Sequence, residues 1–452
     1  MTTAVTTAAP ARVGFAGPDV PALADVRSCV HCGFCLPTCP TYIATGSELE
    51  SPRGRLHLIG AILDGRIEAN EHVLPHLDLC LQCRACETAC PSNVPFGRIM
   101  EDARAAIVAT GPSSRPRAWS LRMLFLERVV ASPPMLRAAL APVRLLARVD
   151  QVIRARREGH EGLVRPLLQR GLGTRAPAAE AQLDALSARP FRRSGLLASP
   201  VEPVARVALL TGCVHGELTP RMHEATLRVL ARLGREVVAP SDQACCGALH
   251  AHAGDSEAAR DLARRNIEAF ERADVEAVIV NAAGCGAAMK EYGRLLRNDS
   301  DWRERAETFA AKVQDATEYV ASSPGFERGL GPIDAVATLQ DSCHLAHAQG
   351  IRDAPRRILN AIPGLQVREL KTPDRCCGAA GLYSLVQPEM SRSVLEAKLD
   401  DVQATGAEVV CTSNPGCTLQ LAAGIVSRGL EAQAMHVLEL LDESYTVRSR
   451  GA

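Results

Sequence analysis

The fold of the amino-terminal part is decided by Cys29-Val-His-Cys32-Gly-Phe-Cys35-Leu-Pro-Thr-Cys39-Pro40, whose pattern returns as Cys80-Leu-Gln-Cys83-Arg-Ala-Cys86-Glu-Thr-Ala-Cys90-Pro91. Each run is C-x2-C-x2-C-x3-C-P, in which three thiolates wrap one iron–sulfur cube and the fourth, in two-cluster ferredoxins, ligates the other cube. The spacing therefore predicts a mainly helical domain over 20–112 that holds two [4Fe–4S] clusters. The predicted ligand sets are crossed: Cys29, Cys32, Cys35 and Cys90 for one cluster, and Cys80, Cys83, Cys86 and Cys39 for the other.

The alternative for these eight cysteines is a pair of zinc knuckles. Zinc knuckles use two C-x2-C pairs that are separated by a longer loop. Two intact runs of four cysteines, both ending in Cys-Pro, favour iron–sulfur clusters over zinc.

Forty residues separate Cys39 from Cys80, and they include Ser51-Pro-Arg-Gly-Arg55 followed by a helical pattern from Leu56 to Leu63. One interpretation is that Arg53 and Arg55 offset the negative charge of the clusters and tune their potentials. The other is that both are surface arginines at the start of a helix.

The carboxyl-terminal half is an internal duplication. Val207–Cys213 corresponds to Ala337–Cys343, Cys245-Cys246-Gly247 to Cys376-Cys377-Gly378, and Gly284–Gly286 to Gly416–Thr418, at offsets of 130, 131 and 132 residues. Such constant offsets indicate a repeat. Short β-branched runs alternate with helical stretches such as Ala225–Leu233 and Ala258–Ala273, which predicts two α/β units with parallel strands over 201–330 and 331–446.

Each repeat carries a Cys…Cys-Cys-Gly…Cys pattern. Adjacent cysteines are poor disulfide partners, but they project two thiolates into one site, and the glycine lets the chain pass close to a bound group. The pattern predicts a second kind of metal, cluster or redox thiol site, and the alternative is a buried group of inert thiols. The candidate ligands are Cys213, Cys245, Cys246 and Cys285 in the first repeat and Cys343, Cys376, Cys377 and Cys417 in the second.

The segment over 113–200 is expected to be an arginine-rich helical connector. It has 16 Arg against 6 acidic residues between Arg115 and Arg193, with helical patterns at Leu121–Val130 and Leu136–Ile153. Either it is a solvated connector, or it docks an acidic partner subunit or anionic lipid. Gly171–Ala176 matches a dinucleotide fingerprint only superficially, because no strand precedes it and Pro177 follows, so a loop is predicted.

Composition excludes several classes of protein. Fifty-one basic residues balance 51 acidic ones and only 3% of residues are aromatic, which argues against nucleic-acid binding. No signal peptide pattern and no apolar run long enough to span a membrane is present. Seventeen cysteines, an odd number, in a chain of 452 residues fit metal or redox chemistry in a reducing cytoplasm rather than a disulfide scaffold.

The eight-cysteine head, Ser51–Arg55 and the two Cys-Cys-Gly repeats together resemble the iron–sulfur subunit of bacterial glycolate dehydrogenase, also called glycolate oxidase. The resemblance is close at Ala244–Ala248, Asn281–Gly286, Lys290–Gly293 and Cys376–Tyr383, and it covers nearly the whole chain. The wider superfamily includes subunits of anaerobic glycerol-3-phosphate dehydrogenase, lactate-utilisation proteins and heterodisulfide reductase. The fold that this implies is a multidomain α+β protein: the two-cluster domain followed by a pseudo-twofold pair of α/β repeat units.

One departure from heterodisulfide reductase bears on function. Its full repeat ends in C-x-x-C and holds a non-cubane cluster, whereas here the last position is Ala288 in the first repeat and Gln420 in the second. Cys411 is an extra thiol in the second repeat, six residues before Cys417. A disulfide-cleaving cluster is therefore not expected.

The resemblance implies a non-catalytic electron-transfer subunit of an oxidoreductase, which works with FAD-containing dehydrogenase subunits that oxidise glycolate or another 2-hydroxy acid. Electrons would pass to a quinone or another acceptor, in the cytoplasm or at the inner face of the cell membrane through a peripheral contact. The chain itself shows no flavin or nicotinamide fingerprint and no nucleophile–base pair. The alternatives are an autonomous disulfide or acceptor reductase, assisted by His250 and His252, and the equivalent subunit of a lactate or glycerol-3-phosphate dehydrogenase.

Overall fold

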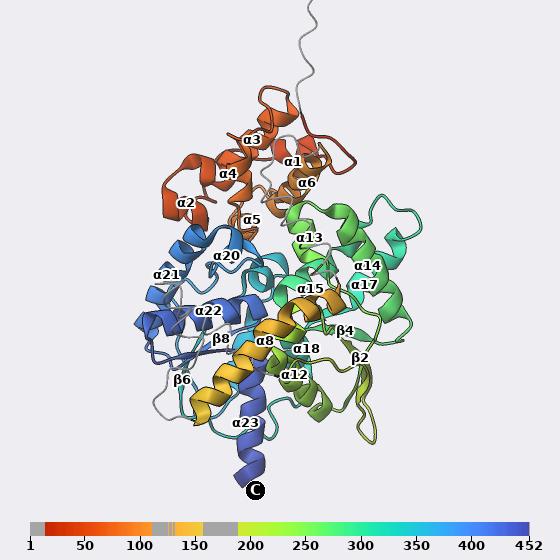
Figure 1. Cartoon of the computed structure of the whole chain (residues 1–452), viewed down its shortest axis with the longest axis vertical. Helices are drawn as coiled ribbons and strands as arrows, with labels where there is room; N and C mark the ends of the chain where they lie inside the picture. The colour runs from red at the N-terminus through yellow and green to blue at the C-terminus, as the bar shows by residue number, and fades with distance from the viewer. Residues whose placement is uncertain (1–13, 111–124, 126–128, 130–131, 157–188, 452) are drawn as a thin grey trace, which may run out of the picture.

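The computed structural model describes residues 14–110, 125, 129, 132–156 and 189–451. A helical amino-terminal unit lies at the top of Figure 1, and the two repeat units lie side by side below it. Most of the predicted helix Leu121–Val130 and the whole predicted loop Gly171–Ala176 fall outside the described residues.

The amino-terminal unit is built from short helices around the two cysteine loops. Ser51 caps the longest helix before the second loop, because its hydroxyl accepts a hydrogen bond from the Gly54 amide (2.9 Å) and Pro52 follows as the first helical residue. Buried apolar side chains such as Ile59, Leu77 and Met100 form its core. The elements are α1 (Leu23–Arg27), α2 (Pro40–Thr45), η1 (Glu48–Glu50), α3 (Pro52–Leu63), α4 (Leu74–Asp78), α5 (Ala85–Thr88) and α6 (Phe96–Ala109). The predicted helix over Leu56–Leu63 is confirmed as part of α3.

The first repeat is a five-stranded sheet in the order β1-β3-β2-β4-β5. All neighbouring strands are parallel except β1, which pairs antiparallel with β3 at the edge. Its strands are β1 (Gly195–Ala198), β2 (Ala205–Leu209), β3 (Arg235–Ala239), β4 (Ala277–Val280) and β5 (Val313–Asp315). Its helices are α11 (Val214–Leu218), α12 (Pro220–Arg232), α13 (Ala248–Ala253), α14 (Ser256–Glu271), α15 (Ala283–Lys290), α16 (Tyr292–Leu295), α17 (Arg303–Lys312) and α18 (Ala316–Ser322).

The second repeat is a four-stranded parallel sheet in the order β7-β6-β8-β9. This is the order β3-β2-β4-β5 of the first repeat without its antiparallel edge strand, so the predicted pair of parallel α/β units is confirmed. Its strands are β6 (Val336–Leu339), β7 (Gln366–Val367), β8 (Val409–Thr412) and β9 (Gln433–His436). Its helical elements are η5 (His344–Ala348), α19 (Asp353–Asn360), α20 (Tyr383–Val386), α21 (Pro388–Thr405), α22 (Pro415–Arg428) and α23 (Val437–Gly451).

The two sheets share one hydrophobic core. Val207 and Ile279 of the first repeat belong to the same buried cluster as Leu339 and Val409 of the second. A continuous core fixes the two cysteine-bearing edges relative to each other, because core packing leaves few voids and little freedom to slide.

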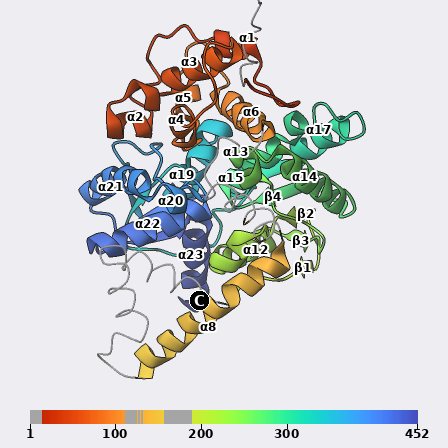
Figure 2. The same cartoon turned by 45° about the horizontal axis from the view of Figure 1, so that its top comes forward.

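The helix predicted over Leu136–Ile153 is confirmed as α8 (Pro133–Arg156). It lies along the first repeat beside α12, and its far end runs away from α12 (Figure 2). Arg144 attaches it there through an ion pair with Glu217 of α11 (Nη2 to Oε2, 2.9 Å). Within the described part of the chain, no helix combines the length and the apolar character needed to cross a bilayer.

Candidate metal centres

The two C-x2-C-x2-C loops of the amino-terminal unit have the same unusual backbone. The residue before the second cysteine is left-handed in both, with φ of 57° at His31 and 57° at Gln82. The residue after that cysteine is also left-handed, with φ of 86° at Gly33 and 61° at Arg84. Side chains other than glycine rarely adopt this region, and strained backbone gathers at functional sites. The repetition indicates that both loops are shaped around the same kind of group.

The first cavity opens at the surface of this unit and encloses about 410 Å³ of space free of protein atoms. Five cysteines line it: Cys29, Cys32, Cys35, Cys86 and Cys90. Cys32 is exposed, and the other three lining thiols of the predicted set are partly exposed. The structure thus brings together the four residues predicted to bind the first cluster.

The second cavity, of about 310 Å³, lies deeper. Its cysteines are Cys39, Cys80, Cys83 and Cys86, and all four are buried. Cys39 comes from the first motif and the other three from the second, while Cys86 also lines the first cavity. The crossed ligand sets stay a prediction, which the placement of Cys90 at the first cavity and of Cys39 at the second favours. The x3 spacer and the following helix α2 carry Cys39 away from its own loop.

The chemistry of these thiols fits a bound cationic group. Burial raises the pKa of Cys35 to about 11 and raises the pKa of Cys83 and of Cys86 well above the usual range. Burial disfavours the thiolate, and an iron centre supplies the positive charge that restores it. The cavities therefore fit the clusters that the sequence predicts, and those clusters would supply one-electron redox chemistry.

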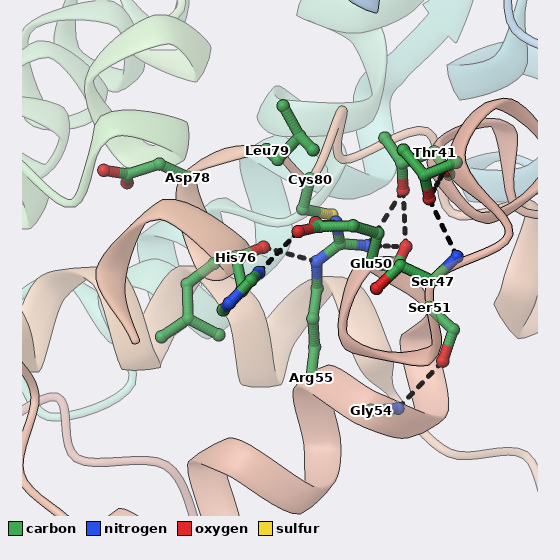
Figure 3. A network of polar contacts seen from close by, with 12 residues as sticks. Thr41, Ser47, Glu50, Ser51, Gly54, Arg55, His76, Asp78, Leu79 and Cys80 are labelled. Atoms are coloured by element: carbon green, nitrogen blue, oxygen red, sulfur yellow. Dashed lines mark hydrogen bonds and ion pairs between the residues drawn. The ribbon is translucent and has the colours of Figure 1, made fainter. Parts of the chain in front are cut away.

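A polar network lies beside the second cavity, which Thr41 and Arg55 help to line (Figure 3). The buried guanidinium of Arg55 donates to the Glu50 carbonyl (2.8 Å), to Thr41 Oγ1 (3.1 Å) and to the carbonyl of His76 (2.7 Å). It also forms an ion pair with the Glu50 carboxylate, whose other oxygen bonds His76 Nδ1. Thr41 Oγ1 in turn lies 3.3 Å from Cys39 Sγ. The interpretation of Arg55 as a surface arginine is wrong, because its side chain is buried in this network.

The second cavity faces the second repeat. Cys83 packs in one buried cluster with Cys376 and Tyr383, and Tyr383 donates its hydroxyl to the carbonyl of Leu79 (2.9 Å). His344 Nε2 contacts the carbonyl of Gln82 (2.8 Å) within the same interface. A thiol of the amino-terminal unit and a thiol of the second repeat are thus neighbours, although they are far apart in the sequence.

In the first repeat, Cys213, Cys245, Cys246 and Cys285 gather as two close pairs. The Sγ atoms of Cys213 and Cys245 are 3.2 Å apart, and those of Cys246 and Cys285 are 3.1 Å apart. Hydrogen bonds from the Cys213 and Cys246 thiols lower the pKa of Cys245 well below its usual range. The loop between β3 and α13 that carries the adjacent pair is thereby held against the loops after β2 and β4.

Two buried side chains fix that loop. Asn266 donates to the carbonyl of Cys245 (2.9 Å) and accepts from the Ala244 amide (2.8 Å). Tyr292 donates its hydroxyl to the carbonyl of Cys246 (2.9 Å). Sequence reasoning missed both residues, since neither belongs to a metal-ligand pattern.

In the second repeat, Cys343, Cys376, Cys377 and Cys417 gather in the same order. Interaction with the Cys343 thiol raises the pKa of Cys376 well above its usual range, and interaction with the Cys376 thiol helps to raise the pKa of Cys377 to about 12. Asn414 Nδ2 lies 3.5 Å from Cys417 Sγ. All eight repeat cysteines follow carboxyl ends of parallel strands, the edge at which such sheets normally build sites.

Ala288 and Gln420 stand where a full C-x-x-C ending would place a cysteine, and both make other contacts in the described structure. Ala288 packs against the core of the first repeat, and the Gln420 amide donates to Ser391 Oγ (3.0 Å). Cys411 lies on β8, fully buried in the shared core, away from the cluster that contains Cys417. The extra thiol therefore does not join the cysteine site of its repeat.

The two candidate proton-transfer histidines differ. His252 Nδ1 donates to Glu101 Oε1 of α6 (2.9 Å), so it joins the amino-terminal unit to the first repeat. His250 is fully buried, and neither of its ring nitrogens has a hydrogen-bond partner in the described structure. A buried polar group without a partner calls for an explanation such as an ion or water at that place.

A single metal ion does not fit these arrangements. Among the residues whose positions are described, no three His, Cys, Asp or Glu side chains are placed to hold one ion. Zinc binds four ligands around one ion, whereas a cube spreads its ligands over four irons. The spacing of the cysteines around the two cavities suits the larger group.

Comparison with protein families matches three segments of the chain. Residues 25–94 match the family described as "4Fe-4S dicluster domain". Residues 207–290 and 337–422 each match the family described as "Cysteine-rich domain", which confirms the internal repeat.

Individual relatives span nearly the whole chain. The chain is 38% identical over 426 residues to the "Probable glycolate oxidase iron-sulfur subunit" of Bacillus subtilis, covering 93% of this chain and 94% of the relative. It is 33% identical over 401 residues to the "Glycolate oxidase iron-sulfur subunit" of Escherichia coli, covering 88% and 90%. "Lactate utilization protein A" of an Exiguobacterium species is 32% identical over 237 residues, covering 52% of this chain and 97% of the relative.

Proposed function

Because this chain belongs to the family of glycolate oxidase iron–sulfur subunits, we propose that it carries electrons from a flavoprotein partner that oxidises glycolate. The observation that carries the proposal is the pair of cysteine-lined cavities in the amino-terminal unit. In this role Cys29, Cys32, Cys35 and Cys90 hold one [4Fe–4S] cluster, and Cys80, Cys83, Cys86 and Cys39 hold the other. Two one-electron centres suit a carrier that accepts the two electrons of a reduced flavin singly.

The placement of the cavities supports an inward direction of transfer. The first cavity has the exposed Cys32 beside the exposed apolar residues Val30 and Phe34, whereas the cysteines of the second are buried and Cys83 lies against Cys376. An exposed apolar rim around a redox centre suits the docking of a partner subunit. Electrons then enter at the surface and leave toward a quinone or another acceptor.

The Cys-Cys-Gly sites extend the proposal. Cys213, Cys245, Cys246 and Cys285 hold a further cluster in the first repeat, and Cys343, Cys376, Cys377 and Cys417 do so in the second; the single metal ion that the sequence also allowed does not fit the described side chains. Four convergent thiols without a cation would repel one another once ionised, and a bound group removes that cost. The buried, unpartnered His250 supports a site in the first repeat.

The proposal includes a pseudo-twofold relation between the repeats. Helix α12 of the first repeat packs against α23 of the second, and α18 of the first packs against α19 of the second. Helices α12 and α19 occupy equivalent places after the first cysteine of each repeat, as α18 and α23 do after the last strand. Such reciprocal contacts are those of an isologous interface and support the axis.

A peripheral membrane contact through α8 completes the proposal, with the protein at the cytoplasmic face of the membrane. The exposed charged side chains among its described residues are Arg137 and Arg148, which suit an anionic lipid surface. The exposed apolar side chains are Met135, Val143, Leu145, Leu146, Val149 and Val152. Binding to anionic but not zwitterionic vesicles supports the contact, and equal binding after Leu145→Glu and Leu146→Glu would contradict it.

The test of the main proposal uses the full chain, purified without oxygen together with its flavin-bearing partner. Adding glycolate should bleach the visible absorbance of the clusters within the catalytic cycle, and glycerol 3-phosphate should not. Clusters that stay oxidised after glycolate has reduced the flavin would refute the electron-transfer role. Faster bleaching with lactate than with glycolate would assign the chain to the lactate branch.

A further inference from the structure

One turn of α3 supplies an arginine to each cavity of the amino-terminal unit. Arg53 lines the first cavity and Arg55 lines the second. Residues two apart on a helix point to nearly opposite sides, so this spacing sends the two guanidiniums in different directions. Each arginine pairs with a glutamate five residues earlier: Arg53 Nε with Glu48 Oε1 (2.8 Å), and Arg55 Nη2 with Glu50 Oε2 (2.8 Å).

The two pairs differ in burial. The side chains of Arg53 and Glu48 are 29% and 46% exposed, whereas those of Arg55 and Glu50 are 1% and 10% exposed. Water and salt screen charges at the surface, while a buried charge or hydrogen bond acts at a lower effective dielectric. The same arrangement of residues therefore has a much stronger electrostatic effect at the second cavity than at the first.

A chain of hydrogen bonds connects Arg55 through Thr41 to Cys39 of the second cavity. Figure 3 shows its first part, from Arg55 to Glu50 and Thr41. Arg55 Nη1 donates to both the Glu50 carbonyl and Thr41 Oγ1. The Thr41 hydroxyl donates to the same carbonyl (2.6 Å), and its oxygen lies 3.3 Å from Cys39 Sγ. A metal-bound thiolate has no proton to donate, so Thr41 must be the donor to Cys39. Arg55 competes with Thr41 for the Glu50 carbonyl, because it donates to the same oxygen, and it also donates to Thr41 Oγ1. This competition favours the turn of the single Thr41 hydroxyl proton from the carbonyl toward a metal-bound sulfur.

We propose that Arg55 is a positioning residue that raises the reduction potential of the cluster in the second cavity by directing the Thr41 hydroxyl to Cys39. The proposal rests on the ligand assignment given under Proposed function. Reduction adds one negative charge to the cluster, and hydrogen bonds to its sulfurs stabilise that charge. The second cluster thereby becomes the preferred resting place of an electron that enters at the first.

The test compares two matched variants of the full-length protein, Arg55→Gln and Arg53→Gln. Each is purified without oxygen and titrated with a reductant while both clusters are followed by electron paramagnetic resonance. Arg55→Gln should lower the equilibrium constant for reduction of the second cluster at least tenfold, a fall of 59 mV for one electron. Arg53→Gln should change the equilibrium constant for reduction of the first cluster less than threefold, because the Arg53 side chain is partly exposed and water screens its charge.

Thr41→Val tests the same path without disturbing the ion pair of Arg55. It removes the hydroxyl at nearly constant volume, and it should lower the same potential in the same direction. In the double variant Arg55→Gln/Thr41→Val, the potential of the second cluster should fall no further than in the single variant with the larger shift. The two effects are not additive, because both residues act through one chain of hydrogen bonds.

An unchanged second potential in Thr41→Val, or equal shifts in Arg53→Gln and Arg55→Gln, would overturn the proposal while leaving both clusters in place. If Arg55→Gln does not fold, because Glu50 loses its buried partner, Thr41→Val decides alone. A wild-type protein with the iron of one cube only would instead refute the ligand assignment, and the role of Arg55 with it. Iron analysis of the same samples separates these results.

Discussion

Replacement of Glu101 by glutamine should loosen the amino-terminal unit from the first repeat. Glu101 of α6 accepts from the Arg294 guanidinium and from His252 Nδ1, and the Glu101 and Arg294 side chains are 14% and 20% exposed. Burial alone would raise the pKa of Glu101, but Arg294 and His252 outweigh it and hold that pKa well below its usual range. The carboxylate is therefore ionised at the interface.

The magnitude follows from the burial of the pair. Removing one partner of a buried ion pair costs about 3–5 kcal/mol, and glutamine recovers part of this by keeping a neutral acceptor. We expect the free energy that favours the docked unit to fall by about 2 kcal/mol, which raises the population of the opened unit roughly thirtyfold. Glu271→Gln is the matched control, because Glu271 pairs with Arg305 at the surface and should cost less than about 1 kcal/mol.

The assay is hydrogen exchange at the α6 amides, which reports local opening. Exchange there should rise roughly thirtyfold in Glu101→Gln and stay nearly unchanged in Glu271→Gln. A carboxylate with a depressed pKa stabilises the folded state above its unfolded pKa of about 4.3, and this contribution is lost as the pH falls through the folded value. The difference between wild type and variant should therefore shrink below about pH 4. A rise smaller than threefold at neutral pH would refute the reasoning.

Three further predictions follow from the same structure. The chain alone should not turn over glycolate with an artificial acceptor, because it lacks a flavin site, and steady turnover by the isolated subunit would contradict this. Gly378→Ala should lower the urea midpoint of unfolding more than Gly247→Ala does. Both substitutions add the strain of a positive φ, about 1–2 kcal/mol. A Cβ at position 378 would also lie 2.4 Å from the Ser391 carbonyl oxygen, whereas a Cβ at position 247 would lie 3.3 Å from its nearest atom. Equal midpoints would be inconsistent with that difference. Replacing Cys245 and Cys246 with serine should remove a spectroscopic signal distinct from those of the amino-terminal clusters and slow electron delivery; unchanged iron content and turnover would mean that these thiols are only packed.

Much of the architecture was predictable because it depends on local spacing. The two C-x2-C-x2-C-x3-C-P runs predict both the loops and the exchange of Cys39 and Cys90 between cavities. The constant offsets predict two units with parallel strands, and the strand order bears this out. The antiparallel edge strand β1 was not predicted, because four residues without a strong alternating pattern carry little signal.

The parts that the sequence did not reveal depend on contacts between distant segments. The spacing of Arg53 and Arg55 does not show which of the two side chains is buried. The burial of Arg55 depends on α4 and on the contact between Glu50 and His76, which are 26 residues apart in the sequence. The pairing of Glu48 with Arg53 and of Glu50 with Arg55 at the same five-residue interval was the available signal. In the sequence, Cys411 could not be told apart from the cysteines of the second repeat's site, because it is the same residue type. Its pairing with Leu339 in the sheet is what assigns it to the core.

The crossed ligation of the two clusters is tested most directly by removing one crossed cysteine at a time. Cys90→Ala should alter the electron paramagnetic resonance signal that Cys32→Ala alters, and Cys39→Ala should alter the one that Cys83→Ala alters, in a wild-type unit that holds about eight irons. Uncrossed ligation would reverse these pairs, so that Cys39→Ala and Cys32→Ala changed the same signal. That result, or zinc in place of iron, would contradict the account.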